Sequence, residues 1–145
     1  MKKTLITLAL AAAAGTALAQ ATPAGLWKTI DDDGKTEKSQ VRITESAGVL
    51  TGKIEKIADP AKQDSKCDKC SDERKDKPVL GMTIIRNAKA DGDKASWEGG
   101  DILDPNDGKV YKLRLKPIEG GKKLEVRGFI GISLLGRTQT WIRVE

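Results

Sequence analysis

Two cysteines are the residues whose type and spacing most directly suggest chemistry in this 145-residue chain. They are Cys67 and Cys70, within the stretch SKCDKCSDERKDKP. A C-x-x-C pair can cycle between dithiol and disulfide, can supply two ligands to zinc, or can close a small disulfide ring. The alternatives to distinguish are therefore a redox centre, a metal site and a loop closed by a structural disulfide, which we call a stapled loop.

The surroundings of the cysteine pair favour a stapled loop. Cycling C-x-x-C motifs place the first cysteine at a helix N-terminus after a strand, whereas these flanks are charged and show no strand-to-helix pattern. Zinc usually takes four ligands, and the chain contains no histidine to complete the set. We predict a disulfide between Cys67 and Cys70 and no metal site. A thiol redox protein remains the weaker alternative.

The remaining titratable residues do not form a recognisable catalytic set. Without histidine, neither Ser-His-Asp nor Cys-His catalysis is available. Glu98 and Asp101 lie three residues apart, on opposite faces of a strand unless the intervening glycines form a bulge. The series Asp101, Asp104 and Asp107 lacks the glycine and glutamate of a calcium-binding loop, so a turn is the simpler interpretation. We expect a protein that is not an enzyme and has no cofactor.

The N-terminal sequence MKKTLITLALAAAAGTALAQA has the three parts of a secretory signal peptide. Two lysines precede an apolar run, and a small-x-small cleavage site ends it. The run is too short for a membrane anchor, which needs about 20 apolar residues. We predict a signal peptide over residues 1–19 and a soluble domain over residues 20–145, exported to the periplasm or secreted. An oxidising compartment would also favour the predicted disulfide.

Charge and length further restrict the class of protein. Loss of Lys2 and Lys3 with the signal peptide lowers the formal net charge from +5 to +3. Acidic residues interrupt every basic run, which is unlike the concentrated basic face of a nucleic-acid-binding protein. We therefore expect no nucleic-acid partner. The mature length suits a single domain.

Short runs with apolar residues at every second position follow the predicted signal peptide, and turn residues separate them. In VYKLRLK, for example, Tyr111, Leu113 and Leu115 share one face. The same alternation places Leu124, Val126 and Ile130 together. We predict eight strands near residues 25–30, 38–45, 49–57, 81–88, 95–103, 109–118, 122–130 and 137–144.

Hairpin-length connections join these strands, except for a long loop over residues 58–78. An open sheet of consecutive hairpins would leave two exposed edges, which closure removes. At eight strands, a barrel interior can be filled by side chains or can hold one small ligand. The sequence therefore predicts an all-β fold, a single eight-stranded up-and-down antiparallel barrel of lipocalin size.

Four segments resemble a known bacterial family. They are GLW at residues 25–27, PVLGMTIIR at 78–86, WEGGDILDPNDGKVYKLRLK at 97–116 and VRGFIGISLLGRTQTWIRV at 126–144. Together they look like the family called domain of unknown function 2147, small exported proteins with a lipocalin-like barrel. By that resemblance, Trp27 of the Gly-x-Trp motif would plug one barrel end beneath Arg143 or Arg137. Because Arg143 shares a strand face with Trp141, its inward position would require a bulge or an amphipathic barrel end.

Two functional hypotheses follow from such a barrel. In the first, the interior binds a small apolar or amphipathic ligand, with Trp97 and Tyr111 as candidate contacts because each ring carries one polar atom. In the second, the outer face or the 58–78 loop docks on an envelope protein. The alternation of apolar and polar residues ends around GFIGISLL. We therefore expect an exposed apolar patch formed by Phe129, Ile132, Leu134 and Leu135.

Overall fold

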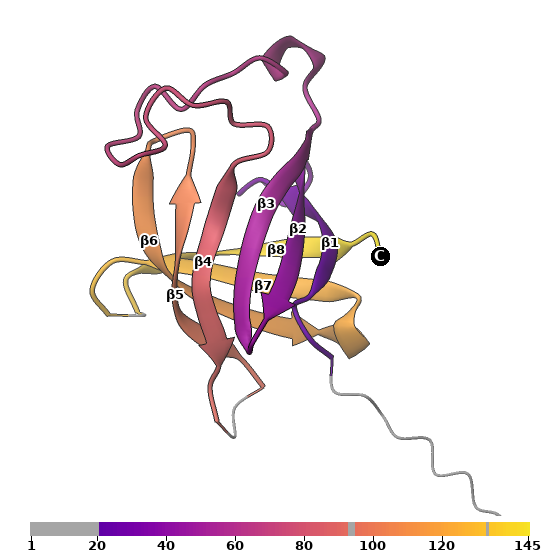
Figure 1. Ribbon diagram of the computed structural model, residues 1–145. Helices are drawn as coiled ribbons and strands as arrows, with labels where there is room; N and C mark the ends of the chain where they lie inside the picture. The colour runs from indigo at the N-terminus through magenta and orange to yellow at the C-terminus, as the bar shows by residue number, and fades with distance from the viewer. Residues whose placement is uncertain (1–20, 93–94, 133) are drawn as a thin grey trace, which may run out of the picture.

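Eight antiparallel strands form the fold in the computed structural model, which describes residues 21–92, 95–132 and 134–145 (Figure 1). The predicted signal peptide, residues 1–19, lies outside the described residues. The strands are β1 (Gly25–Ile30), β2 (Glu37–Ser46), β3 (Val49–Ile57), β4 (Thr83–Ala90), β5 (Trp97–Asp104), β6 (Lys109–Ile118), β7 (Lys123–Phe129) and β8 (Gly136–Arg143). Each lies within two residues of its predicted bounds at both ends.

The sheet closes on itself, so the predicted eight-stranded up-and-down barrel is confirmed. Each strand pairs with the next, and β8 pairs with β1. That last pairing is short, with Trp27 opposite Arg143 and Lys28 opposite Ile142, whereas β7 and β8 share seven paired positions. We call the junction of β1 and β8 the seam. Two backbone hydrogen bonds beyond the end of β8 extend it, from Val144 N to Leu26 O and from Leu26 N to Glu145 O.

Inward side chains at alternate positions form the core. Leu113 and Leu115 of β6 are buried, as are Leu124 and Val126 of β7. Ile130, which was expected to continue the buried row of β7, is 61% exposed instead. The reason is that β7 ends at Phe129, so Ile130 already belongs to the turn.

Trp27 closes one end of the barrel. Its ring is fully buried, and its Nε1 donates a hydrogen bond to the Pro23 carbonyl at 2.7 Å. The Arg143 guanidinium lies 4.2 Å from the ring centroid, a cation-π contact. Since β8 stays in regular register with β7, the barrel end is amphipathic and no bulge is needed. Arg143, and not Arg137, lies over Trp27.

Residues 58–82, which we call the canopy, cross the opposite end of the barrel (Figure 1). Cys67 and Cys70 are joined by a disulfide, and both are almost completely buried in the hydrophobic core cluster. The canopy also packs on the β5–β6 turn, where a Cβ added to Gly108 would lie only 1.9 Å from the Lys69 carbonyl oxygen. Such burial disfavours the thiol redox alternative, because a substrate could not reach either sulfur without displacing this segment.

Besides these strands, the described ranges contain two three-residue 3-10 helices, Pro60–Lys62 and Glu119–Gly121. No helix within those ranges has the length and apolar character required to cross a membrane.

Candidate functional site

A cavity of about 580 Å³ occupies the barrel interior at the canopy end. Its mouth lies between the β1–β2, β5–β6 and β7–β8 turns, as its lining by Asp32, Asn106 and Leu135 shows. Trp27 and Arg143 close the other end of the barrel. The interior is therefore open on one side, which resolves the choice between a filled barrel and a hollow one. The volume is in the range of pockets that hold one small molecule.

Aliphatic side chains from the middle strands form one wall of the cavity. Ile54 of β3, Ile84 of β4, Ile102 of β5 and Val126 of β7 all line it. All except Ile102 are at least 94% buried. This wall offers no hydrogen bonds through its side chains and would contact the apolar part of a ligand.

The wall formed by β1, β2 and β8 is polar. Thr29 and Ser39 both line the cavity, and their hydroxyl oxygens lie 2.8 Å apart. Thr29 is 7% exposed, so its hydroxyl can bond to little besides Ser39 or a molecule in the cavity. Polar and apolar walls facing each other suit an amphipathic occupant.

A hydrogen-bonded ladder runs from the floor of the cavity to its mouth along β8. Trp141 Nε1 donates to Gln139 Oε1 at 3.1 Å, and Gln139 Nε2 donates to Asp32 Oδ1 at 3.0 Å. Arg137 Nη1 lies 3.2 Å from Asp32 Oδ2, and its Nη2 lies 3.3 Å from Asp104 Oδ2. Burial alone would lower the pKa of Arg137, but Asp32 and Asp104 outweigh it and raise that pKa. Arg137 thus ties the β1–β2 turn to β5.

Tyr111 lines the cavity and donates its hydroxyl to Asp107 Oδ2 at 2.6 Å. Deprotonation would break this bond and place a phenolate beside a carboxylate. The hydrogen bond to Asp107, with burial and repulsion adding to it, raises the pKa of Tyr111 to about 12.

Tyr111 is the single tyrosine of the chain, so its titration can be followed directly by ultraviolet absorbance. We expect a midpoint near pH 12 in the folded protein and near 10 after denaturation. A raised folded pKa means that the stabilisation is fully present below about pH 10 and is lost as the pH rises toward 12. Asp107→Asn should lower the folded midpoint toward 10. A native midpoint near 10 would contradict the Tyr111–Asp107 bond.

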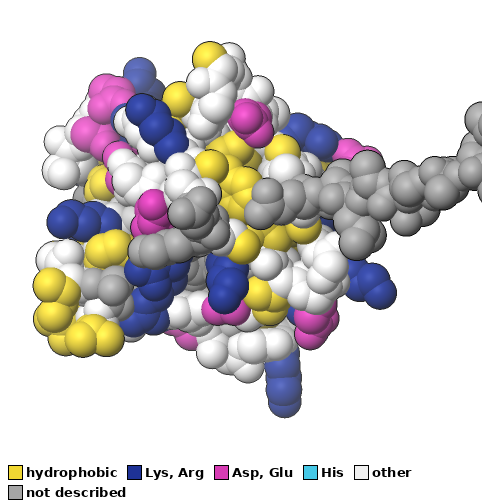
Figure 2. Space-filling model, turned by 90° about the horizontal axis from the view of Figure 1, so that it is seen from below, with side chains coloured by type: hydrophobic (Ala, Val, Ile, Leu, Met, Phe, Trp, Pro, Cys, Tyr) yellow, Lys and Arg dark blue, Asp and Glu magenta, His cyan; other side chains and the backbone are white. Residues whose placement is uncertain are grey.

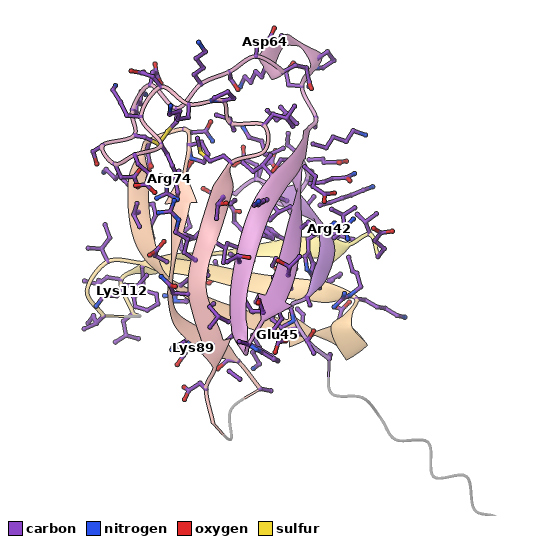
Figure 3. All side chains as sticks on the ribbon, viewed as in Figure 1. Arg42, Glu45, Asp64, Arg74, Lys89 and Lys112 are labelled. Carbon is purple, nitrogen blue, oxygen red and sulfur yellow. A yellow bond between two sulfur atoms is a disulfide. The ribbon has the colours of Figure 1, made fainter. Side chains whose placement is uncertain are left out.

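A second cavity, of about 910 Å³, lies between the canopy and the barrel mouth. Lys38, Ser39, Ile54, Pro105 and Asn106 line both cavities, so the two spaces adjoin. Canopy residues such as Asp64, at the top of Figure 3, line its outer side. The canopy therefore covers part of the mouth.

Arg74 fastens the canopy to the barrel (Figure 3). It is 6% exposed, and its Nη1 donates to the Thr83 carbonyl at the start of β4, at 2.9 Å. Its Nε and Nη2 donate to both carboxylate oxygens of Asp72. The hydrogen bonds from Arg74 lower the pKa of Asp72 to about 2, against the opposing effect of burial.

The two ring residues proposed as ligand contacts lie in different places. Tyr111 faces the cavity, whereas Trp97 begins β5 beside the β4–β5 turn and packs against the core from outside the described cavity lining. Trp141 supplies the indole that lines the cavity instead. Sequence reasoning did not identify Trp141, Gln139 or Asp32 as site residues. The sequence of β8 contained a signal for Trp141 and Gln139. Both share one strand face with Arg137, since the three residues stand at every second position.

Three of the four acidic residues considered for catalysis or metal binding are engaged in other contacts, whereas the buried Oδ1 of Asp101 has no hydrogen-bond partner among the described residues. A bulge at Gly99 puts Glu98 and Asp101 on the outer face, where Glu98 pairs with Arg114. Asp104 Oδ1 accepts from Asn106 N, and Asp107 Oδ1 accepts from Lys109 N, as expected for a turn. Among the residues that the structure describes, no cluster of three potential metal ligands is found.

Comparison with known proteins supports the same fold. No curated protein matches the chain. One similar solved structure is HP1028 from Helicobacter pylori, described as belonging to the lipocalin family. The two share 23% identity with a TM-score of 0.73, over 86% of this chain and 84% of that one. The family model described as "Uncharacterized protein conserved in bacteria (DUF2147)" matches residues 25–143, and the chain therefore belongs to this bacterial family.

Proposed function

We propose that the protein is an exported, non-enzymatic binding protein that holds one small amphipathic molecule in the barrel. The observation that carries the proposal is the cavity itself, with an aliphatic wall facing a polar ladder. A disulfide in a protein of a bacterial family is compatible with export to an oxidising compartment. The lipocalin-like barrel, shared with HP1028, is of a size that can enclose one ligand.

The charges at the mouth restrict the polar group of the ligand. Asp31, Asp32 and Asp104 line the cavity, against Lys38 and Arg137. Both cations already have acidic partners, since Lys38 Nζ lies 3.7 Å from Asp31 and Arg137 bridges the other two carboxylates. An anionic head group would meet unfavourable charge there. The ligand therefore has an apolar chain and an uncharged or cationic head.

Three probes with the same alkyl chain test this assignment by titration calorimetry at neutral pH. We expect dodecylamine to bind about tenfold or more tightly than dodecanoate, with dodecanol between them. Equal or tighter binding of dodecanoate would overturn the head-group assignment while leaving the cavity as the binding site. Failure of all three to bind would contradict the proposed function.

Gly128 offers a way to block the cavity without adding charge. It lines the cavity from β7, and a Cβ there would lie 3.3 Å from Tyr111 Cβ. We expect Gly128→Leu to weaken dodecylamine binding by about tenfold or more, because the new side chain would take the space of the alkyl chain. Thr140→Leu adds a similar group at an exposed position of β8 and should leave binding unchanged. Equal affinity in the two variants would place the ligand outside the barrel.

A further inference from the structure

The turn between β7 and β8 exposes four large aliphatic side chains. Ile130 is 61%, Ile132 60%, Leu134 82% and Leu135 71% exposed. Single exposed residues of this kind are common, but four on one turn form a patch that calls for a partner. We call these four residues the aliphatic turn. Phe129, also expected in the patch, is only partly exposed and pairs across the sheet with Lys112.

The aliphatic turn belongs to the rim of the cavity. Ile130 and Leu135 line the cavity as well as being exposed. Figure 1 places this turn at the left side of the barrel, and Figure 2 shows hydrophobic side chains gathered at the same margin of the molecule. Any surface that covers the turn is therefore next to the mouth.

Basic side chains flank the aliphatic turn. Lys112 Nζ donates to the Gly131 carbonyl at 3.4 Å, and Figure 3 shows Lys112 beside the turn. Arg127 and Arg114 face each other in register on the outer side of β7 and β6, with Glu98 as the partner of Arg114. Aliphatic residues next to cations are the combination that binds the surface of an anionic bilayer.

The size of the patch argues against a second copy of the chain as the partner. A standard protein interface buries about 800 Å² on each side. Four aliphatic side chains supply at most about 500 Å², which is well below that area. A bilayer does not require a matching surface, since its acyl chains accommodate whatever is inserted.

We propose that the aliphatic turn inserts into the surface of an anionic bilayer with Lys112 at the lipid phosphates, and that the cavity mouth, whose carboxylates are paired with Lys38 and Arg137, lies next to that surface. An amphipathic ligand can then pass between bilayer and cavity with its alkyl chain shielded from water. The transfer step rests on the proposed function, whereas bilayer docking depends only on the aliphatic turn and its basic neighbours.

Vesicle sedimentation tests the docking step. The chain purified from expressing bacteria without detergent should bind vesicles of phosphatidylethanolamine and phosphatidylglycerol in equal parts. The double variant Ile132→Ser/Leu134→Ser, which changes the two residues of the aliphatic turn that do not line the cavity, should lower this partitioning about tenfold per side chain removed. The matched control is Ile142→Ser/Val144→Ser, in which two residues that are each 43% exposed near the closed end are changed. The control should bind vesicles as tightly as the unmodified chain does. All three proteins carry the same N-terminal sequence, so that segment cannot cause a difference between them.

Two further measurements test the contribution of Lys112 to docking and the binding of ligand in the cavity. Lys112→Glu should weaken binding to these vesicles about fivefold or more and leave weak binding to phosphatidylcholine vesicles unchanged. Unmodified protein that fails to bind anionic vesicles, or a double variant that binds as well as the control, would overturn the proposal. The proposal would also be overturned if the unmodified protein self-associates without binding vesicles and the double variant stays monomeric. That result would show that the aliphatic turn is a dimer interface. Dodecylamine binding measured in the same variants reports on the cavity alone, so a failure of the proposed function is seen independently.

Discussion

Replacing Trp27 with alanine is expected to lower the free energy of unfolding by about 3–5 kcal/mol. The indole is fully buried at the closed end of the barrel, so its removal leaves a cavity that the rigid sheet cannot fill. It also removes the Nε1 hydrogen bond to Pro23 and the surface on which Arg143 lies. For a domain of this size, such a loss is a large fraction of the total stability. Urea denaturation followed by circular dichroism measures it.

Trp97→Ala is the matched control for that experiment. Trp97 is the same residue type but only partly buried, beside the β4–β5 turn, and its loss should cost less than half as much. A double-mutant cycle with Arg143→Met would isolate the contact between Trp27 and the guanidinium, which we expect to contribute about 0.5–2 kcal/mol. Equal losses of unfolding free energy in the two tryptophan variants would show that Trp27 contributes no more to stability than a partly buried tryptophan does.

Replacing Arg74 with alanine is expected to release the canopy while the barrel stays folded. The substitution leaves the Thr83 carbonyl and the Asp72 carboxylate without their partner, at a local cost of about 2–3 kcal/mol. Proteolytic cleavage within residues 58–82 should therefore become about 30- to 150-fold faster. Far-ultraviolet circular dichroism should be nearly unchanged, because the strands do not depend on this contact.

Two variants and a pH series make the test specific. Arg74→Lys keeps the charge but cannot hold both oxygens of Asp72, so it should give an intermediate rate. Lys77→Ala changes an exposed cation in the same segment and should have no effect. Because the folded pKa of Asp72 is depressed from 3.8 to about 2, its stabilising contribution is present above pH 4. It is lost as the pH falls through about 2. Equal cleavage rates in Arg74→Ala and Lys77→Ala would show that Arg74 does not anchor the canopy.

The barrel could be predicted from the sequence because its signals are local. Alternation along VYKLRLK and the turn residues between strands located the hairpins, and the cost of unpaired edges predicted closure. The order and pairing of the strands then followed without further information. Local patterns of this kind identify where strands begin and end, and their consistency is what makes a simple meander predictable.

The cavity was harder to predict, because its polar wall departs from the rule that inward residues are apolar. In β8 the inward row is Arg137, Gln139 and Trp141, followed by Arg143, and alternation alone does not distinguish such a row from an outer face. Contacts with distant residues explain this row: Asp32, more than a hundred residues away, and Asp104 are the partners of Gln139 and Arg137, and Trp27 is the partner of Arg143. Trp97 lies opposite the buried Leu115 at the start of β5, at the end of the barrel away from the canopy, and its ring chemistry alone does not indicate at which end the cavity lies. The path of the canopy likewise depends on distant contacts, such as that of Lys69 with Gly108.

The seam has a consequence for how the protein is made. Ring closure joins Trp27 to Arg143, two positions from opposite ends of the chain. A ribosome that has released β1 must still synthesise more than a hundred residues before the partner strand emerges. During that interval the nascent chain presents a free β1 edge and an uncovered indole, which is the state most prone to stick to other chains. Holding the chain unfolded until translation is complete would therefore protect it, since the ring can close only when both ends are present.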